Sequence, residues 1–594
     1  MSTIDVTQVI DFTGGLNFRA DQFQLADNES PGMLNVEIDP RGGVFSRAGW
    51  LKKNSTAIAF NGDWKPKGLY NYKFTGAPQI MLTTAFQDAA TPINGAIYYS
   101  SGGNFSYLNS ASSTPLAVKS ANGAGMTQWE QTMYFALGRS ATQMYKWTVG
   151  DTYATALAAS GPTWQPYQLP IGGYMPRAEL TITHANKLFV ANTYEDGTAY
   201  KNRLRWSHES SPENWFQDDY IDIIAGGDGI RGVQVVDGQL LIFKPKAIYL
   251  LMGYDADSFQ LVELTTVLGI DYPQQAAAGS GGVYFFDYPN GLFFYDRSGI
   301  QDLFSRMRPI ILNNEVNSSY TEEITLSFVR NRLWISMPYK DSTEGSPPDY
   351  PSVNFIFDPT IGPTGAYTMF QSAPWFDDPF TSSIDGYGLV SGCDWRDAND
   401  NPYYLLISPY QSFPYVMSVD DYDYVSDDAP VTFTGRFGTS YTTSWFEDKA
   451  YVQLKTFIRP YYVFKEVGQK SIIRLNVYRN YNESTQYGGT RSITLEPAIA
   501  GSVYSEDGSG GLYVLGLPQG ETPDPLPANS GIYDTSVEGA TIKRKGVSRL
   551  GKGFSIQLQF IGPDDSTDMV NNPGRKWGLN SIAYKFKRRK IRSN

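Results

Sequence analysis

One pattern recurs along most of this chain: a short apolar run, a turn rich in Gly, Asn or Asp, and a second apolar run. It extends from about Trp64 to about Asp423. The clearest examples are residues 126–136, 179–191, 232–243 and 326–336. Two apolar runs joined by such a turn predict a β-hairpin. Much of the chain is therefore expected to fold as successive antiparallel hairpins.

The hairpins recur at a regular spacing. Their second runs lie roughly 43–55 residues apart, at Ile80, Met133, Leu188, Leu240, Val283 and Leu333. Each tends to be followed by further strand candidates, at residues 96–99, 144–147, 203–207, 247–251, 291–295 and 354–358. A four-stranded unit repeated about six or seven times predicts a β-propeller, and residues 386–416 are a candidate for a further unit. A set of unrelated β-meanders is the alternative.

Size and composition support an all-β protein of more than one domain. The 594 residues exceed the size at which one hydrophobic core keeps growing, so two or three domains are expected. Tyr (41) and Phe (33) favour strands, whereas Gly (57) and Pro (35) favour turns. We assign residues 56–430 to the propeller.

Residues 1–55 are expected to form an N-terminal arm that lies on the body or on a neighbouring subunit. Asn28 followed by Glu29 predicts a short helix, because Asn is a common N-cap. Residues 36–38 and 44–47 flank the turn Asp39-Pro40-Arg41-Gly42-Gly43 and predict a hairpin.

Residues 431–594 are expected to form a β-sandwich-like platform domain. Longer apolar segments follow the acidic loop at residues 420–428. They are residues 451–464, 471–478, 491–495, 553–562 and 581–586. The insert 501–539 is rich in Gly, Pro, Asp and Ser and predicts a flexible loop.

Residues that could carry catalysis are sparse. Cys393 is the one cysteine, which excludes an intramolecular disulfide, and His184 and His208 are the two histidines. A Ser-His-Asp relay or a histidine-rich metal site is therefore not expected. No nucleotide-binding, hydrolase or metalloprotease motif occurs. We expect no enzyme activity, no metal and no cofactor.

Two acidic patterns are candidates for a calcium site and for a glycosidase site. Residues 397–401 have the oxygen-ligand spacing of a calcium loop, but Pro402 and Ser408 replace its glycine and glutamate, so a turn is favoured. The pairs Asp218-Asp219 and Asp377-Asp378 supply the two carboxylates that a glycosidase needs. Adjacent residues of a strand point to opposite faces, however, so the two carboxylates of a pair are not expected to act on one substrate.

Charge is distributed unevenly. The net charge is −12, yet the last twenty residues hold eight Lys or Arg and no acid, so the preceding chain carries about −20. The candidate subunit or DNA contacts are Lys585, Lys587, Arg588, Arg589, Lys590 and Arg592. They either form the solvated face of a last strand that points Ile582, Tyr584 and Phe586 inward, or meet an acidic neighbour or a phosphate backbone.

The N-terminus shows no signal peptide, and no apolar run is long enough to span a membrane. Synthesis in a bacterial cytoplasm is expected.

Two groups of motifs stand out: residues 14–17, 30–35 and 39–44, and residues 202–207, 211–215, 219–223, 238–244, 248–249 and 281–286. These segments resemble nozzle (tail tubular) proteins of short-tailed bacteriophages, a family of virion proteins. They cover roughly the first half of the chain, and the second half resembles the family only in its strand-rich texture.

The resemblance implies a structural protein of the virion tail. Such subunits form a ring of six copies below the adaptor (gatekeeper) ring on the portal side. The ring encloses the channel that conducts phage DNA during ejection without sequence specificity, and tail fibres or spikes can attach to it. A receptor-binding tail protein, and less so a propeller glycosidase acting on host polysaccharide, are the alternatives.

Overall fold

The computed structural model is built almost entirely from β-strands, which confirms the predicted all-β class. It describes residues 4–20, 24–54, 56–59, 65–74, 79–86, 95–141, 143–157, 176–195, 197–225, 228–340, 348, 350–362, 364–371, 388–407, 414–417, 438–447, 454–457, 461–464, 471–482, 486, 491–495, 541–543, 551–562 and 577–588. The helices among these residues are the short segments η1 (Pro273–Gln275), α1 (Pro309–Leu312) and η2 (Thr321–Glu323). Among the described residues, no helix is long and apolar enough to cross a membrane.

Within the described part of the chain, seven four-stranded antiparallel sheets follow one another. The first three are β8–β11 (Lys65–Tyr72, Ile80–Phe86, Gly95–Ser100, Ser106–Tyr107), β12–β15 (Gly125–Trp129, Thr132–Ala136, Tyr145–Thr148, Thr155–Ala156) and β16–β19 (Arg177–His184, Lys187–Glu195, Thr198–Trp206, Tyr220–Asp222). The next three are β20–β23 (Gly232–Val236, Gln239–Lys244, Ala247–Met252, Gln260–Thr265), β24–β27 (Ala276–Gly279, Gly282–Asp287, Gly291–Asp296, Gly299–Asp302) and β28–β31 (Thr325–Val329, Arg332–Met337, Val353–Asp358, Ala366–Phe370). The predicted repeat is confirmed, because all six apolar markers fall in the second strand of a sheet.

The seventh sheet combines distant parts of the chain. It contains β32 (Ser391–Arg396), β33 (Pro402–Ile407) and β34 (Pro414–Met417), and its fourth strand is β7 (Trp50–Lys52). Leu51 pairs with Val416. The further unit predicted within residues 386–416 is present, but a strand from the predicted N-terminal arm completes it.

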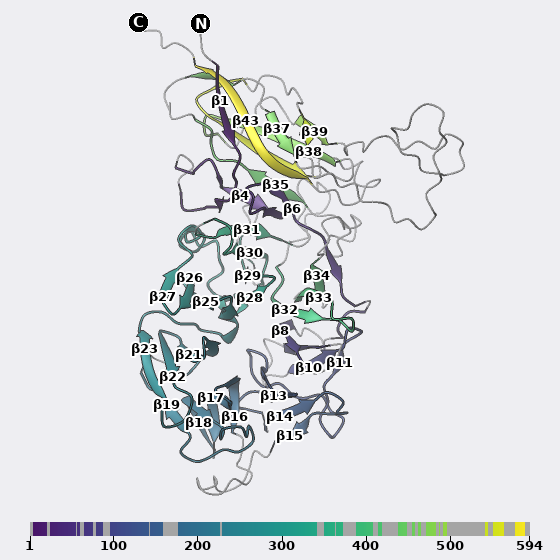
Figure 1. The fold of residues 1–594 in the computed structure, drawn as a ribbon, viewed down its shortest axis with the longest axis vertical. Coiled ribbons are helices and arrows are strands. Elements are labelled where there is room, and N and C mark those ends of the chain that lie inside the picture. The colour runs from purple at the N-terminus through teal and green to yellow at the C-terminus, as the bar shows by residue number, and fades with distance from the viewer. Residues whose placement is uncertain are drawn as a thin grey trace, which may run out of the picture.

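The sheets are arranged in a ring (Figure 1). From β12 to β32, the first strand of each sheet lies against the first strand of the next, and β32 lies against β8. First strands of all seven sheets line a central cavity of about 530 Å³. The last strand of each sheet lies at the outer rim.

Tight turns explain how the sequence folds into these hairpins. At Ala185–Asn186 and Asp237–Gly238, both residues of the turn have positive φ, between 45° and 75°. This is the geometry of the two-residue turns that match the twist of paired strands, and Asn, Asp and Gly adopt it at low cost.

Two further sheets form the C-terminal part. One holds β36 (Lys455–Phe457), β37 (Tyr461–Phe464), β40 (Thr541–Lys543), β41 (Gly551–Gly553) and β43 (Gly578–Arg588). The other holds β35 (Thr439–Thr442), β38 (Ser471–Arg479), β39 (Arg491–Leu495) and β42 (Ile556–Gly562). Both contribute side chains to one buried cluster, in which the rings of Tyr462 and Phe560 are 5.4 Å apart. The predicted 501–539 loop lies outside the described residues.

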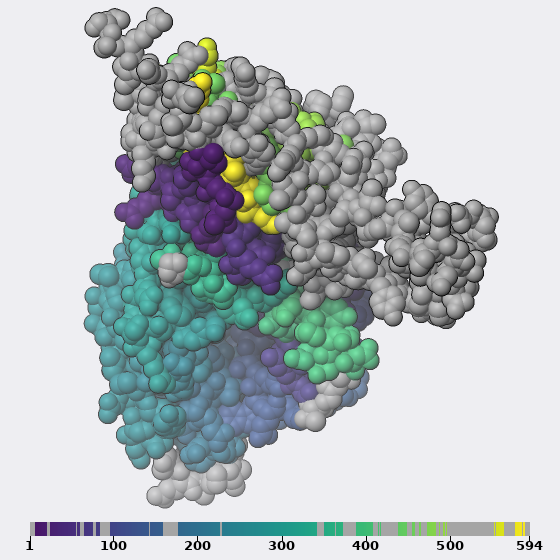
Figure 2. Space-filling model, turned by 45° about the horizontal axis from the view of Figure 1, so that its top comes forward, coloured from purple at the N-terminus to yellow at the C-terminus, as the bar shows by residue number. Residues whose placement is uncertain are grey.

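Several strands of the N-terminal segment pair with strands of these two sheets. Its strands are β1 (Ile4–Val9), β2 (Gly15–Leu16), β3 (Glu29–Ser30), β4 (Gly32–Leu34), β5 (Val36–Ile38) and β6 (Val44–Ser46). Strands β1 and β6 pair with β43, and β4 pairs with β35. Figure 2 shows the segment between the ring of sheets and the C-terminal strands. The arm therefore contributes strands to the sheets of its own chain.

Of the two elements predicted in the arm, one is confirmed and one is wrong. The hairpin is present as β5 and β6, with Ile38 opposite Val44. The short helix at Asn28 is absent, because Glu29 and Ser30 form β3 and pair with β2. A partner strand outweighed the local capping signal.

Candidate functional site

The motif residues of the N-terminal segment meet at a joint between the ring of sheets and the C-terminal sheets. We call this region the junction; it comprises residues 14–17, 30–37 and 46–50 and the side chains that they contact. Strands β2, β4 and β5 lie against β31, the outer strand of the sixth sheet. The junction therefore brings three parts of the chain together.

Asn35 is the central polar residue of the junction. It is fully buried, and its φ of 53° lies in the left-handed region that Asn tolerates better than most residues. Its Nδ2 donates to the carbonyl of Gly438 at 2.9 Å, and its Oδ1 accepts from Arg47 Nε and from the Gln371 amide, both at 2.9 Å. One side chain thus connects the C-terminal part, the N-terminal segment and the end of β31.

Arg47 and Trp50 extend this connection toward the seventh sheet. Arg47 is almost fully buried, and its guanidinium lies 4.0 Å from the centroid of the Trp50 ring. Trp50 packs against Trp334 of the sixth sheet at 5.6 Å and against Phe370 of β31 at 6.4 Å. The start of β7 is therefore held by packing as well as by its pairing with β34.

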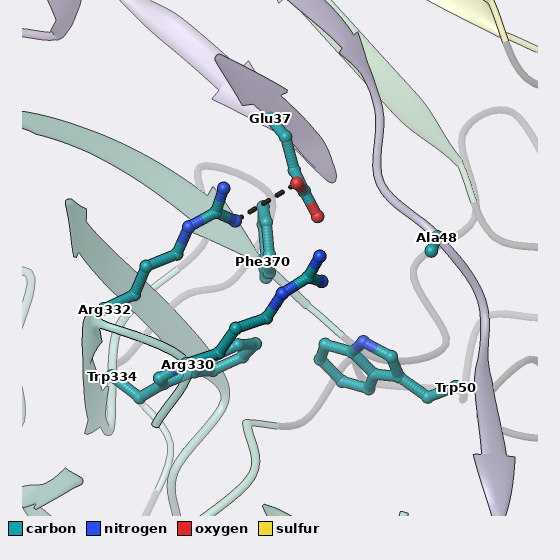
Figure 3. A pocket seen from close by; sticks show the side chains of 7 residues that line it. All are labelled: Glu37, Ala48, Trp50, Arg330, Arg332, Trp334 and Phe370. Carbon is teal, nitrogen blue, oxygen red and sulfur yellow. Dashed lines mark hydrogen bonds and ion pairs between the residues drawn. The ribbon is translucent and has the colours of Figure 1, made fainter. Parts of the chain in front are cut away.

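A partly buried ion pair links β5 to the sixth sheet. Arg332 contacts Glu37 at 3.1 Å and Asp358 at 3.0 Å, and Figure 3 shows its guanidinium directed at the Glu37 carboxylate. Burial opposes the charge, but the two carboxylates outweigh it and raise the pKa of Arg332 above its ordinary value.

The junction leaves almost no space beside this pair. The residues around it are Glu37, Ala48, Trp50, Arg330, Arg332, Trp334 and Phe370 (Figure 3). They enclose about 10 Å³, which suits at most one water molecule. The geometry is that of a packed joint, with no room for a ligand.

The two glycines of the first motif are explained by close packing. Gly15 has a φ of +66°, and a Cβ there would lie 2.8 Å from the Tyr367 carbonyl of β31. A Cβ on Gly14 would lie 2.7 Å from the Asn28 carbonyl. Both positions therefore require a residue without a side chain.

The second motif block forms an ion network on the third sheet. Arg205 is almost fully buried and contacts Glu195 at 2.9 Å, while Arg203 contacts Glu195 at 3.1 Å and Asp222 at 2.7 Å. The Tyr220 ring lies 3.7 Å from the Arg203 guanidinium. The alternating arginines of this block therefore stabilise a sheet.

Lys244 ends the next motif segment and is fully buried. Its Nζ donates to the carbonyls of Ile223 at 2.7 Å and Ala225 at 2.6 Å. Desolvation by burial lowers its pKa, which nearby Asp228 partly offsets. The lysine holds the loop that connects the third and fourth sheets.

The central cavity is lined mainly by neutral polar and apolar groups, many of them from the seven first strands. Its charged lining includes Lys67, which pairs with buried Glu323 at 2.9 Å, and Asp394, whose pKa burial raises. Cys393 also lines it, and burial raises the pKa of its thiol. Among the described residues, no group of three His, Cys, Asp or Glu side chains could hold a metal ion.

The structure describes the predicted basic segment only in part. The predicted alternation is confirmed, since Ile582, Tyr584 and Phe586 are buried in β43. Lys587 is exposed. Lys585 and Arg588 belong to the same strand, and Arg589, Lys590 and Arg592 lie outside the described residues. Their predicted contacts with DNA or another subunit stay predictions.

The two histidines and the candidate calcium loop occupy structural positions. His184 ends β16, is buried, and its ring lies 5.8 Å from Phe189; its pKa is lowered by burial. His208 packs edge-on against Phe216. Asp397 accepts hydrogen bonds from the amides of Asn399 and Asn401, so the predicted turn is confirmed.

Of the acidic pairs, Asp219 is buried and Asp218 is exposed. Asp377 and Asp378 lie outside the described residues.

The sequence does not reveal the distant partners that unite the junction. The pairing of β7 with β34 has no local signal, because it joins strands from opposite ends of the chain segment that forms the ring of sheets. The Glu37–Arg332 ion pair has none either, because 295 residues separate the two charges.

Comparisons with known proteins give little further guidance. No family model matches the chain, and no curated protein does. Solved structures that match include two titled "Crystal structure of BBS1N in complex with ARL6DN", one soaked with mercury and one with lead. Each is 10% identical, covers 63% of this chain and 98% of the matched chain, and has a TM-score of 0.33.

Proposed function

We propose that this chain is a non-enzymatic structural protein of a bacteriophage tail, a nozzle subunit of the kind that its sequence motifs resemble. In this proposal the seven sheets are the blades of a β-propeller and the C-terminal sheets form a β-sandwich. Six copies assemble in a ring below the adaptor. The ring conducts DNA during ejection and offers attachment points for fibres or spikes.

The observation that supports this most directly is where the motif residues lie. Asn35, Gly15 and Arg205 are each buried in packing or hydrogen bonds within the chain. A motif made of such residues preserves a rigid shape, which is what a subunit of a ring requires. Shape-preserving motifs are typical of structural proteins, whereas catalytic motifs place reactive groups at a pocket.

The cavity and the charge constrain how DNA would pass. A cavity of about 530 Å³ within the ring of sheets is far too small for a DNA duplex, so the duplex would pass between copies of the chain. The net charge of −12 suits a conduit, because an acidic wall repels phosphates and keeps the duplex from binding.

Imaging of the particle would test the proposal. An antibody raised against the chain, with gold-labelled detection, is applied to phage particles produced by the genome that encodes it. We expect gold at the tail below the head, and a symmetry-averaged map that places seven small sheets per subunit around the axial channel. Label confined to fibre tips would favour the receptor-binding alternative, and unlabelled particles would contradict the proposal.

A further inference from the structure

The outer strands of the seven sheets, at the rim of the ring, differ in length and in whether other strands cover them. β11 and β15 have two residues each, β19 and β7 three, and β27 four. β31 has five residues but is covered by β2, β4 and β5. β23 has six and, among the described strands, pairs only with β22. Since proteins usually keep edge strands short or covered, β23 is the exception on this rim.

Exposed apolar side chains lie on and near this strand and on the neighbouring third sheet. Val262 of β23 is 37% exposed and Val267, just after it, is 71% exposed. On the neighbouring third sheet, Tyr220 of β19 is 37% exposed and Ile224 is 77% exposed. We call these four residues, together with β23, the rim patch. Buried Lys244 holds the backbone around Ile224, so that residue is presented on a fixed loop.

A second open edge lies at the other end of the molecule. β1 has six residues, IDVTQV, and pairs on one side with β43; no strand of the described chain pairs with its other side. Val9 is buried, whereas Val6 is 57% exposed and Ile10, just after the strand, is 62% exposed. The strand carries no Lys, Pro or bulge, which are usual features that prevent pairing of an edge with another chain, and Asp5 is its one charged residue.

We propose that β1 of one copy adds to the open edge of β23 on the next copy, so that the two sheets become continuous across the subunit boundary. Main-chain hydrogen bonds would supply affinity, and Val6 and Ile10 would cover the apolar rim patch. This proposal rests on the proposed ring, because its occupant is a second copy of the chain.

Geometry favours this pairing over pairing of like edges. β1 and β23 lie far apart on the molecule (Figure 1). A contact between two different surfaces builds a ring when its rotation closes, whereas a self-paired edge stops at a dimer.

Disulfide trapping tests the contact directly. Val6→Cys and Val262→Cys proteins of different tag length are mixed at a concentration where the wild type associates and are then oxidised. We expect a product that contains one copy of each. The matched control pairs Val6→Cys with Leu312→Cys, since Leu312 is also 71% exposed but lies outside the rim patch. The wild-type protein, whose single cysteine is Cys393, gives the background level of cross-linking.

The contact is rejected if Val262→Cys cross-links mainly to itself, if Leu312→Cys traps as well as Val262→Cys, or if the wild type stays monomeric at every concentration. A second variant, Val262→Lys, should weaken association by about tenfold or more while its β-type circular dichroism is kept, and Leu312→Lys should not. Failure of these tests with gold label still on the tail would reject the contact and leave the proposed function intact.

Discussion

Single residues determine how firmly the three parts of the chain are joined. Asn35 and Arg332 each receive partners from segments hundreds of residues away, so the effect of changing them extends beyond their own strand. A buried polar group that loses its partner costs more than the bond itself, because the remaining group has left water without compensation. The junction should therefore be sensitive to small changes.

Replacing Asn35 by Ala should lower the free energy of unfolding by about 2–4 kcal/mol, because three hydrogen bonds are lost and their partners stay buried. Urea denaturation followed by tryptophan fluorescence measures this. Asn313→Ala is the control, since Asn313 is exposed, and should change the value by less than about 0.5 kcal/mol. Equal effects of the two variants would contradict the role of Asn35.

Asp287 should make stability depend on pH. Burial raises its pKa to about 6, although a hydrogen bond from Asn290 opposes this. The folded state then binds the proton more tightly than the unfolded state between about pH 4 and pH 6. Its contribution to stability is fully present below that range and is lost as the pH rises through it.

The Asp287→Asn variant should therefore gain stability relative to the wild type as the pH rises from about 4 to about 6, by about 1–3 kcal/mol in total. Urea denaturation at several pH values checks this. A difference between the two proteins that does not change with pH would show that Asp287 ionises as an exposed aspartate does.

Strands are the elements in which local and distant signals separate. Apolar alternation and turn residues suffice for hairpins such as β20–β21, because both strands and their turn are adjacent in the chain. β7 has three residues and pairs with a strand more than 360 positions away, so its place depends on the finished ring. The seventh sheet is accordingly the one whose stability depends most on the N-terminal segment.

Trp50→Ala should destabilise the chain by about 3–5 kcal/mol, because a buried indole that packs on Trp334, Phe370 and Arg47 is removed. Hydrogen exchange should rise first in β7 and β34. Tyr254→Ala, at a residue that is 71% exposed, is the control and should leave exchange in both strands unchanged. Unchanged exchange in the Trp50 variant would show that the ring closes without this strand.

At the scale of the whole molecule, the ring and the C-terminal sheets share strands and a core. Residues of the fifth and sixth sheets belong to the same buried cluster as those of β37, β42 and β43. The N-terminal segment completes sheets in both parts. Two parts connected in this way are expected to unfold together.

Calorimetry should accordingly show one main thermal transition for the full chain, although its length of 594 residues would permit two. Glu37→Gln should shift that transition as a whole, because it leaves Arg332 without one of its two carboxylates. Two separate transitions, with the variant moving only one, would show that the parts fold independently.

The sequence by itself determined the all-β class, the repeating four-stranded unit, the hairpin at residues 36–46 and the alternation of β43, since each depends on neighbours within a few dozen residues. Tertiary structure alone decided that the N-terminal segment is shared between sheets, that Glu29 and Ser30 are extended rather than helical, and that β7 closes the seventh sheet. The reason is physical: these features depend on hydrogen bonds and ion pairs between residues hundreds of positions apart, and a local pattern cannot specify a partner at that distance.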